Sequence, residues 1–385
     1  MTTSARVGFI AAIVVAVVVA VVAKAHSETP APLFAGSIQL DFLTVPTDKK
    51  AREHTLDGAT VELSLKMTKE LTKDISANVK VCFACHGFEV GMAFVELRAS
   101  DALRFRVGRM IPAFGGFPLR HDPANHMTSD KPLPYDMGRM VHRSEWNEGI
   151  LPAPWVDNGA ELGGTYFWNG GQFDYAVYAV SGPKAGLNAA DFDFQLSRSP
   201  DNYYVDNNSQ PAIGGRLAGS VDLDANATLN LGASAMAGRY DPERRLGFAV
   251  AGADATLQLF GLYLRGEYLI RATEVAVGDD PAARWKYGPA PGGTYAGYFT
   301  KDGFYGEAEV PVGPISIVGR WDGLRRKGNV LIGSALSSSA SVYRYTGALA
   351  FRLQRGIRFK SSVEYYQFTD FPREIAIHLG MAAPF

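Results

Sequence analysis

The residues whose types and spacing suggest chemistry are Cys82 and Cys85, the only two cysteines of the chain, with His86 directly after them. Together they form a C-x-x-C-H, the pattern of covalent c-type haem attachment. Two thiols three positions apart can add to the two vinyl groups of one haem, and the adjacent imidazole can then ligate the iron. The motif therefore predicts one covalent haem c, bound through Cys82 and Cys85, with His86 as the proximal ligand.

Two other interpretations of the cysteines stay open. A disulfide between positions three apart closes a strained, very short loop, so it would stabilise the fold little. A C-x-x-C-H can also arise by chance in a chain of 385 residues and leave two idle thiols. The haem interpretation is favoured because the chain has no other cysteine and carries the export signal described below.

A haem iron held by His86 needs a second axial ligand for electron transfer, or an open position for small-molecule chemistry. Residues 111–158 are rich in suitable donors and follow the motif closely. His121 and His126 are the leading candidates, because both precede a Pro-rich segment that can turn the chain back. The other candidates are His142, Met127, Met137 and Met140 in the same segment, and His54 and His378 elsewhere.

Three arginines flank the motif on neighbouring predicted strands: Arg98, Arg104 and Arg106. Because arginine binds carboxylates in a bidentate manner, they are candidates for binding the haem propionates. The alternative is the basic wall of a pore constriction, which would face acids of segment 111–158, namely Asp122, Asp130 and Asp136.

The N-terminus predicts export. Arg6 precedes an apolar run at 7–22, and Ala23-Lys24-Ala25 then forms a small-residue cleavage site before His26. The run is shorter than the roughly 20 residues that a membrane-spanning helix needs. We therefore predict a cleaved signal peptide at 1–25 and a mature protein of 26–385.

Composition excludes several classes of protein. A formal net charge of −1 gives no basic excess for nucleic-acid binding. A mean hydropathy of −0.04 and the lack of a second long apolar run exclude a helical membrane protein. No nucleophile motif indicates an enzyme. Many short segments instead alternate apolar and polar residues with period two, which is typical of strands with one apolar and one polar face.

The alternation predicts an all-β fold, a transmembrane antiparallel barrel of about sixteen strands. At 374–385, for example, Ile375, Ile377 and Leu379 share one face, and Glu374 and His378 share the other. Large apolar outer faces suit lipid, and charged inner faces suit a lumen. Tight turns alternate with long polar links at 111–158, 183–211, 275–301 and 328–340. The predicted strands are 37–45, 58–68, 75–82, 88–99, 103–110, 159–169, 171–182, 212–223, 227–240, 246–259, 261–274, 302–312, 314–327, 341–355, 356–370 and 373–385.

In this arrangement Cys82 faces the lumen, and the motif at 82–86 caps the hairpin between the third and fourth strands. Strand parity from the C-terminus puts this hairpin at the end of the barrel with the long links, which would face the cell exterior. Segment 111–158 is unusually long and is therefore expected to be functional. We expect it to fold inward as a long third extracellular loop and cover the haem.

The barrel pattern that ends at Phe385 resembles bacterial outer-membrane barrels, whose assembly machinery recognises such an end. With the motif of Cys82, Cys85 and His86, the chain is similar to the fused monohaem cytochrome–porins of that membrane. The resemblance implies an outer-membrane electron carrier that is embedded in lipid and exchanges electrons with periplasmic or extracellular cytochromes. Here the motif follows two or three strands instead of preceding the barrel, which puts the iron oxidation of that family in doubt. The alternative function is a diffusion porin for small solutes.

Overall fold

The computed structural model describes residues 31, 33–46, 58–84, 87–137, 139–146, 149–184, 206–275, 287–353 and 356–385. The predicted signal peptide at 1–25, together with His54, Cys85 and His86, lies outside these residues. No helix among the described residues is long and apolar enough to cross a membrane.

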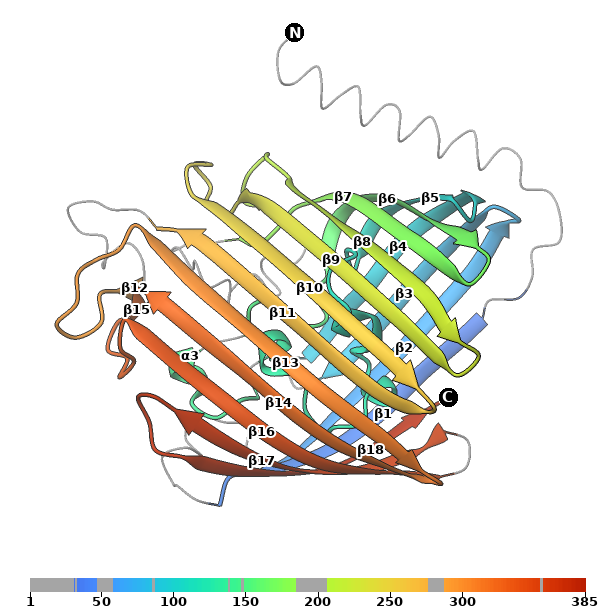
Figure 1. The fold of residues 1–385 in the computed structure, drawn as a ribbon. Helices are drawn as coiled ribbons and strands as arrows, with labels where there is room; N and C mark the ends of the chain where they lie inside the picture. The colour runs from blue at the N-terminus through green and yellow to red at the C-terminus, as the bar shows by residue number, and fades with distance from the viewer. Residues whose placement is uncertain are drawn as a thin grey trace, which may run out of the picture.

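Sixteen strands form one closed antiparallel barrel, which confirms the predicted fold and strand number (Figure 1). Each strand pairs with the barrel strands that precede and follow it in the chain, and β1 pairs with β18 to close the ring. The barrel strands are β1 (Leu33–Thr44), β2 (Gly58–Thr72), β3 (Ile75–Ala84), β4 (Gly87–Ser100), β5 (Leu103–Met110), β6 (Asp157–Trp168), β7 (Gly171–Val180), β8 (Ala212–Asp224), β9 (Ala227–Arg239), β10 (Gly247–Leu259), β11 (Leu262–Glu274), β13 (Tyr298–Val312), β14 (Ile315–Gly328), β16 (Ser339–Arg352), β17 (Arg358–Phe368) and β18 (Glu374–Pro384).

The remaining elements lie in the connections. A two-stranded sheet of β12 (Tyr287–Gly288) and β15 (Val330–Leu331) joins two of the long links. The connection between β5 and β6 contains the short helices η1 (Phe117–Arg120), η2 (Pro123–Asn125), η3 (Leu133–Tyr135) and α3 (Arg143–Trp146).

The two faces of the strands differ as the alternation predicts. On β1, Ile38 and Leu40 are 39% and 43% exposed, whereas Gln39 and Asp41 between them are 4% and 3% exposed. The apolar side chains point outward and the polar ones point inward. This arrangement fits a barrel in lipid, because closure pairs the backbone groups of every strand and leaves no open sheet edge.

The seam of the barrel uses the last residue of the chain. Ile38 of β1 lies opposite Ala383 of β18. Beyond β18, the Phe385 amide donates to the Gly36 carbonyl at 2.9 Å, and the Gly36 amide donates to the Phe385 carbonyl at 2.8 Å. The barrel therefore closes between the strand at Ile38 and the end of the chain, as predicted.

The connections also follow the predicted alternation. Tight turns, such as those at 73–74, 101–102 and 260–261, all lie at one end of the barrel. The longer links, including the one between β5 and β6, begin at the opposite end (Figure 1). The β3–β4 hairpin, where Ala84 lies opposite Gly87, belongs to the end with the long links, as strand parity predicts.

Candidate functional site

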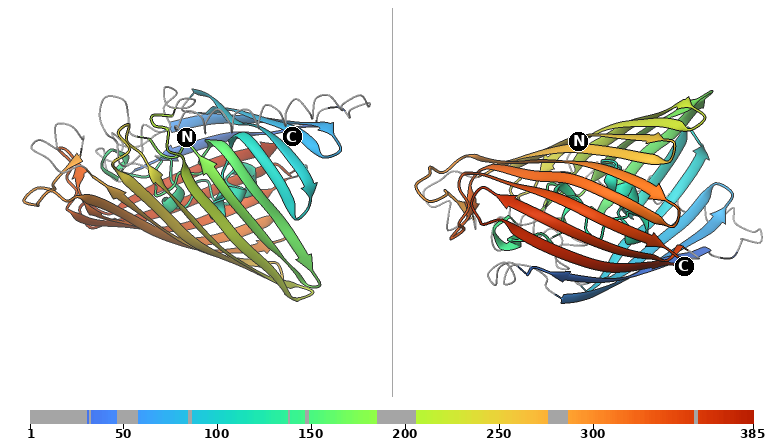
Figure 2. Two further views of the ribbon diagram at one scale, coloured as in Figure 1. Left: turned by 90° about the horizontal axis from the view of Figure 1, so that it is seen from above. Right: turned by 60° about the horizontal axis from the view of Figure 1, so that its bottom comes forward.

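The connection between β5 and β6, hereafter the inserted loop, occupies the lumen (Figure 2). Its described residues are 111–137, 139–146 and 149–156. Many of its apolar side chains are fully buried inside the barrel, among them Phe117, Leu133 and Trp146. The prediction that this segment folds inward is confirmed. Cover of a haem by the loop stays a prediction.

A carboxylate on the barrel wall attaches the first part of the inserted loop. Glu267 on β11 accepts hydrogen bonds from the Gly116 amide at 3.0 Å and the Phe117 amide at 3.2 Å. The Tyr135 hydroxyl donates to the same carboxylate. Burial and the neighbouring Glu267 raise the pKa of Tyr135 well above its usual value, so the hydroxyl keeps its proton and acts as the donor.

Basic residues of the neighbouring strands β13, β14 and β16 attach later parts of the inserted loop through its backbone carbonyls. Arg320 donates to the Asp130 carbonyl at 3.1 Å, and Lys301 donates to the Trp146 carbonyl at 2.8 Å. Arg344 donates to the Lys131 carbonyl at 2.5 Å and also binds the Asp130 carboxylate at 2.7 Å. Charged donors on β13, β14 and β16 thus bind the loop carbonyls. These hydrogen bonds fix the position of the loop along the barrel axis.

The described residues enclose at least two spaces between the inserted loop and the barrel wall. The larger, hereafter called the channel, is a space of about 510 Å³ between the loop and the wall of β5, β7–β11 and β13. The smaller, hereafter the Cys82 cavity, has about 100 Å³ and lies between the loop and the wall of β1–β4.

Charged groups of both signs line the channel. Arg104, Arg120, Arg216 and Arg265 reach it, with Asp174 and Asp254 as the acids among its lining residues. Three of the arginines are neutralised in direct ion pairs. Arg216 binds both oxygens of Asp254 at 2.5 and 2.9 Å, and Arg120 and Arg265 each lie 3.1 Å from Glu307.

Arg104 differs from the other channel arginines. Among the described residues, no carboxylate lies within ion-pair distance of its guanidinium, and its buried Nε atom has no hydrogen-bond partner. Its cross-strand neighbours are Arg98 on β4 and Gly163 on β6, and neither supplies a counter-charge. Arg104 therefore lines the channel without a direct counter-ion among the described residues.

The Cys82 cavity brings together three of the predicted site residues. Cys82, His121 and His126 all line it. Cys82 lies on the lumen side of β3, as the alternation predicts, and on the outer side the Phe83 and Phe88 rings pack against each other at 5.0 Å across the β3–β4 pair. This aromatic contact fixes the face on which the thiol points inward.

The histidines of the cavity are neutral imidazoles. Burial, opposed by the charge of Asp122, lowers the pKa of His121 to about 4, and burial also lowers that of His126 well below its usual value. His121 Nδ1 lies 2.6 Å from the Pro118 carbonyl, which can only accept, so Nδ1 carries the proton and Nε2 carries the lone pair, which can accept from Lys80 Nζ at 3.5 Å. Both ring nitrogens of His126 are buried without a hydrogen-bond partner.

A lysine and an aspartate hold His121 against the wall. Lys80 Nζ on β3 lies 2.5 Å from Asp122 Oδ1 and 3.5 Å from His121 Nε2. Burial alone would raise the pKa of Asp122, but the charge and hydrogen bond of Lys80 lower it below its usual value. The ion pair links the inserted loop to the strand that carries Cys82.

The side chains around the Cys82 cavity have the chemistry to hold a haem, but the cavity is too small for one. A thiol and a neutral imidazole whose Nδ1–H is bound to a carbonyl match the groups that hold haem and orient an iron ligand. Pockets that hold small-molecule ligands and cofactors have volumes of about 300–1,000 Å³, however. The cavity of about 100 Å³ does not hold a porphyrin between Cys82 and His121 with the loop in this position.

The predicted arginines lie apart from Cys82. Arg106 pairs with Glu96 at 2.6 Å and with Glu161 at 3.3 Å, both on adjacent strands. Neither Arg104 nor Arg106 lines the Cys82 cavity. The acids of the inserted loop bind other partners, since Asp122 pairs with Lys80 and Asp130 with Arg344. Arg106 therefore pairs with acids of the wall, not with acids of the loop.

Four other side chains that were predicted as candidate iron ligands lie in three different places. His142 stacks on Phe371 with ring centroids 4.1 Å apart, and Met140 is fully buried. Met137 lines the Cys82 cavity, where its sulfur accepts a hydrogen bond from Lys131 at 2.8 Å. His378 faces the lumen, as predicted, beside Glu364. Sequence reasoning missed Glu267 and Arg344, whose only signal was their position on inward faces.

Comparisons with known proteins bear on the fold. No protein-family model matches the chain. No curated protein matches its sequence. Solved structures do match. An OmpF of Salmonella typhi in complex with daunomycin is 10% identical, with a TM-score of 0.56, and the match covers 92% of this chain and 97% of that one.

Two further structures give the same result. The anion-selective porin from Comamonas acidovorans is 12% identical, with a TM-score of 0.53, over 93% of this chain and 100% of that one. The trimer form of OmpT, an outer-membrane protein of Vibrio cholerae, is 8% identical, with a TM-score of 0.53, over 92% and 99%. The chain therefore has the fold of outer-membrane porins.

Proposed function

We propose that the protein is a diffusion channel for small polar solutes in the bacterial outer membrane. The observation that carries this proposal is the space of about 510 Å³ that remains beside the inserted loop and is lined by charged and polar side chains. The apolar outer face suits lipid, and the porins with a similar fold support both the location and the function. Transport of this kind needs no catalytic residue.

Arg104 should set part of the ion preference of the channel. Replacing it with glutamine (Arg104→Gln) removes the one channel-lining arginine that has no ion-pair partner. One unit charge within about 8 Å of a passing ion contributes about 0.5 kcal/mol in water, partly screened by salt. We expect the anion-to-cation permeability ratio to fall about 1.5- to 3-fold, measured as the reversal potential across planar bilayers in a KCl gradient.

Arg325→Gln is the matched control. Arg325 is about half exposed and pairs with Asp302 away from the channel lining. Its removal should leave the reversal potential unchanged. Equal shifts for the two variants would mean that Arg104 does not face the ion path.

The second candidate function is electron transfer by one haem c bound through Cys82, Cys85 and His86. The observation that favours it is the meeting of the Cys82 thiol with two neutral histidines at one cavity. In this function the haem would supply one-electron redox chemistry, and His121 or His126 would supply a second ligand. The partners would be cytochromes on either side of the membrane.

Intact-mass measurement distinguishes the two functions. The protein is produced in cells competent in cytochrome c maturation, purified in detergent and weighed. A mass equal to the bare polypeptide is expected for a channel alone. An added mass of one haem, with a c-type reduced-minus-oxidised spectrum, would support electron transfer and require the inserted loop to move away from Cys82.

A further inference from the structure

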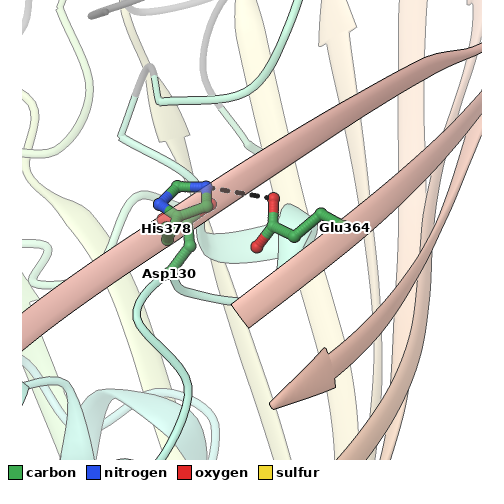
Figure 3. Close-up of side chains that lie close together, drawn as sticks. All are labelled: Asp130, Glu364 and His378. Carbon is green, nitrogen blue, oxygen red and sulfur yellow. Dashed lines mark ion pairs between the residues drawn. The ribbon is translucent and has the colours of Figure 1, made fainter. Parts of the chain in front are cut away.

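A second cluster of ligand-bearing side chains lies where the inserted loop meets the seam of the barrel. It consists of Asp130 from the inserted loop, Glu364 from β17 and His378 from β18 (Figure 3). One ligand atom from each residue lies within 4.8 Å of the others. The three residues are 2%, 0% and 0% exposed. Cys82 and the channel arginines do not belong to this cluster.

Several polar atoms around this cluster have no hydrogen-bond partner. Both ring nitrogens of His378 are buried without one, although Nε2 lies 3.3 Å from Glu364 Oε2 and Nδ1 lies 3.9 Å from Asp41 Oδ2. Glu364 Oε1, Asp41 Oδ1 and Gln39 Oε1 are also unpaired. A buried polar atom without a partner costs roughly 1–3 kcal/mol, and these oxygens are all acceptors. The imidazole nitrogens and these oxygens can all act as metal ligands, so a bound cation would satisfy several of them at once.

The ion pairs around the cluster leave a small excess of negative charge. Among the described residues, ion pairs that include those of His378 with Asp41 and Glu364 connect the cluster to a network in which carboxylates outnumber guanidiniums by one. The carboxylates are Asp41, Asp130, Glu307, Glu309, Asp322 and Glu364, and the guanidiniums are Arg120, Arg139, Arg265, Arg320 and Arg344. In a buried setting, one uncompensated negative charge is unfavourable. A proton on His378 balances this charge, whereas a divalent ion exceeds it by one unit, so the geometry and the unpaired atoms carry the argument for a metal.

We propose that His378, Glu364 and Asp130 bind one divalent transition-metal ion, with Zn²⁺ as the representative ion. One imidazole and two carboxylates form a donor set that Zn²⁺ accepts. Ligand atoms at about 2.1 Å from one ion lie about 3.4–4.2 Å apart, so the observed spread requires only a small contraction. Arg344 Nη1 binds Asp130 Oδ2 and Glu364 Oε2, which leaves Glu364 Oε1 for the metal.

An ion can reach the site from solvent, and its binding would link the inserted loop to the barrel wall. Asp130 and its neighbour Ser129 also line the Cys82 cavity, through which an ion can reach the cluster. Because Asp130 belongs to the inserted loop and the other two ligands belong to the wall, the metal joins the loop to the last two strands. Metal binding would therefore hold the constriction of the channel in place.

Zinc titration of the detergent-purified protein tests the site. After treatment with a chelator, the wild-type protein is titrated with ZnCl₂ by calorimetry, and the stoichiometry is checked by native mass spectrometry. Because other residues of the chain can also bind zinc, the readout is the difference between the wild type and a variant. We expect His378→Gln to remove one zinc per chain or to weaken that site at least about tenfold.

His142→Gln is the matched control, since His142 is also buried but stacks on Phe371 and lies outside the cluster of three ligands. It should retain the zinc that His378→Gln loses. Equal zinc binding by the wild type and His378→Gln would overturn the proposal and leave a proton on His378 as the balancing charge.

Anomalous diffraction at the zinc edge from wild-type crystals keeps the test decisive if the His378 variant fails to fold. A peak within bonding distance of His378, Glu364 and Asp130 supports the site. A map without a peak at this position, from crystals grown with zinc, overturns it.

Discussion

Replacing Arg344 with methionine should cost about 3–5 kcal/mol of the free energy of unfolding, because the change leaves buried carboxylates without their counter-ion. Arg344 is fully buried and uses all of its N–H groups. It binds Asp322 at 2.6 and 3.0 Å, Asp130 at 2.7 Å and Glu364 at 3.3 Å. The measurement is urea unfolding of the protein in lipid vesicles, followed by tryptophan fluorescence.

The same replacement should change the channel. Arg344 also binds the Lys131 carbonyl, so its loss detaches the inserted loop from β16. Single-channel conductance should rise and become noisier. Arg325→Met is the control, because the exposed pair of Arg325 with Asp302 should contribute only about 0–1 kcal/mol. Similar losses of stability in the two variants would show that the buried network does not hold the loop.

Gly115→Ala should have the second largest effect, because the site has neither the backbone conformation nor the space for a side chain. Gly115 has φ of +67°, where an L-residue costs roughly 1–2 kcal/mol. A Cβ atom at this position would also overlap the Tyr135 hydroxyl and Glu267 Oε1. The substitution therefore breaks the hydrogen bond between Tyr135 and Glu267, which attaches the inserted loop to β11. We expect a loss of about 2–4 kcal/mol in the free energy of unfolding.

Gly313→Ala separates the effect of the backbone conformation from the effect of the missing space. Gly313 has φ of +60°, but no atom lies within 4 Å of the position that its Cβ would occupy. It should lose only the backbone contribution, roughly 1–2 kcal/mol, with unchanged conductance. Gly115→Ala should lose more and should also raise the conductance. If both variants lose the same stability, the contact between Tyr135 and Glu267 contributes nothing to holding the loop.

The strands were predictable because each one carries its own signal. Along β1 or β18, apolar and polar residues alternate between the lipid face and the lumen face within about ten residues. This pattern can be recognised without information from the rest of the chain. The inward fold of the inserted loop was predictable for a related reason. A segment of that length with many apolar and donor side chains needs a protected place, and the lumen provides one.

The partners inside the lumen were not predictable in the same way. Alternation shows which face a residue occupies but not which residue lies opposite. Arg106 was assigned to acids of the loop or to haem propionates, whereas the strand register puts it directly opposite Glu96 and Glu161. Glu267 and Arg344 gave no signal beyond their inward position, because their roles depend on where a distant loop packs.

Single-channel recording of the purified wild-type protein in planar lipid bilayers tests the central proposal most directly. Folding is first confirmed by heat-modifiable mobility on gels. A channel between the inserted loop and the wall of β5–β13 predicts stable, ohmic current steps that Arg104→Gln makes less anion-selective. A folded barrel that inserts into the bilayer and passes no ions would contradict the proposal.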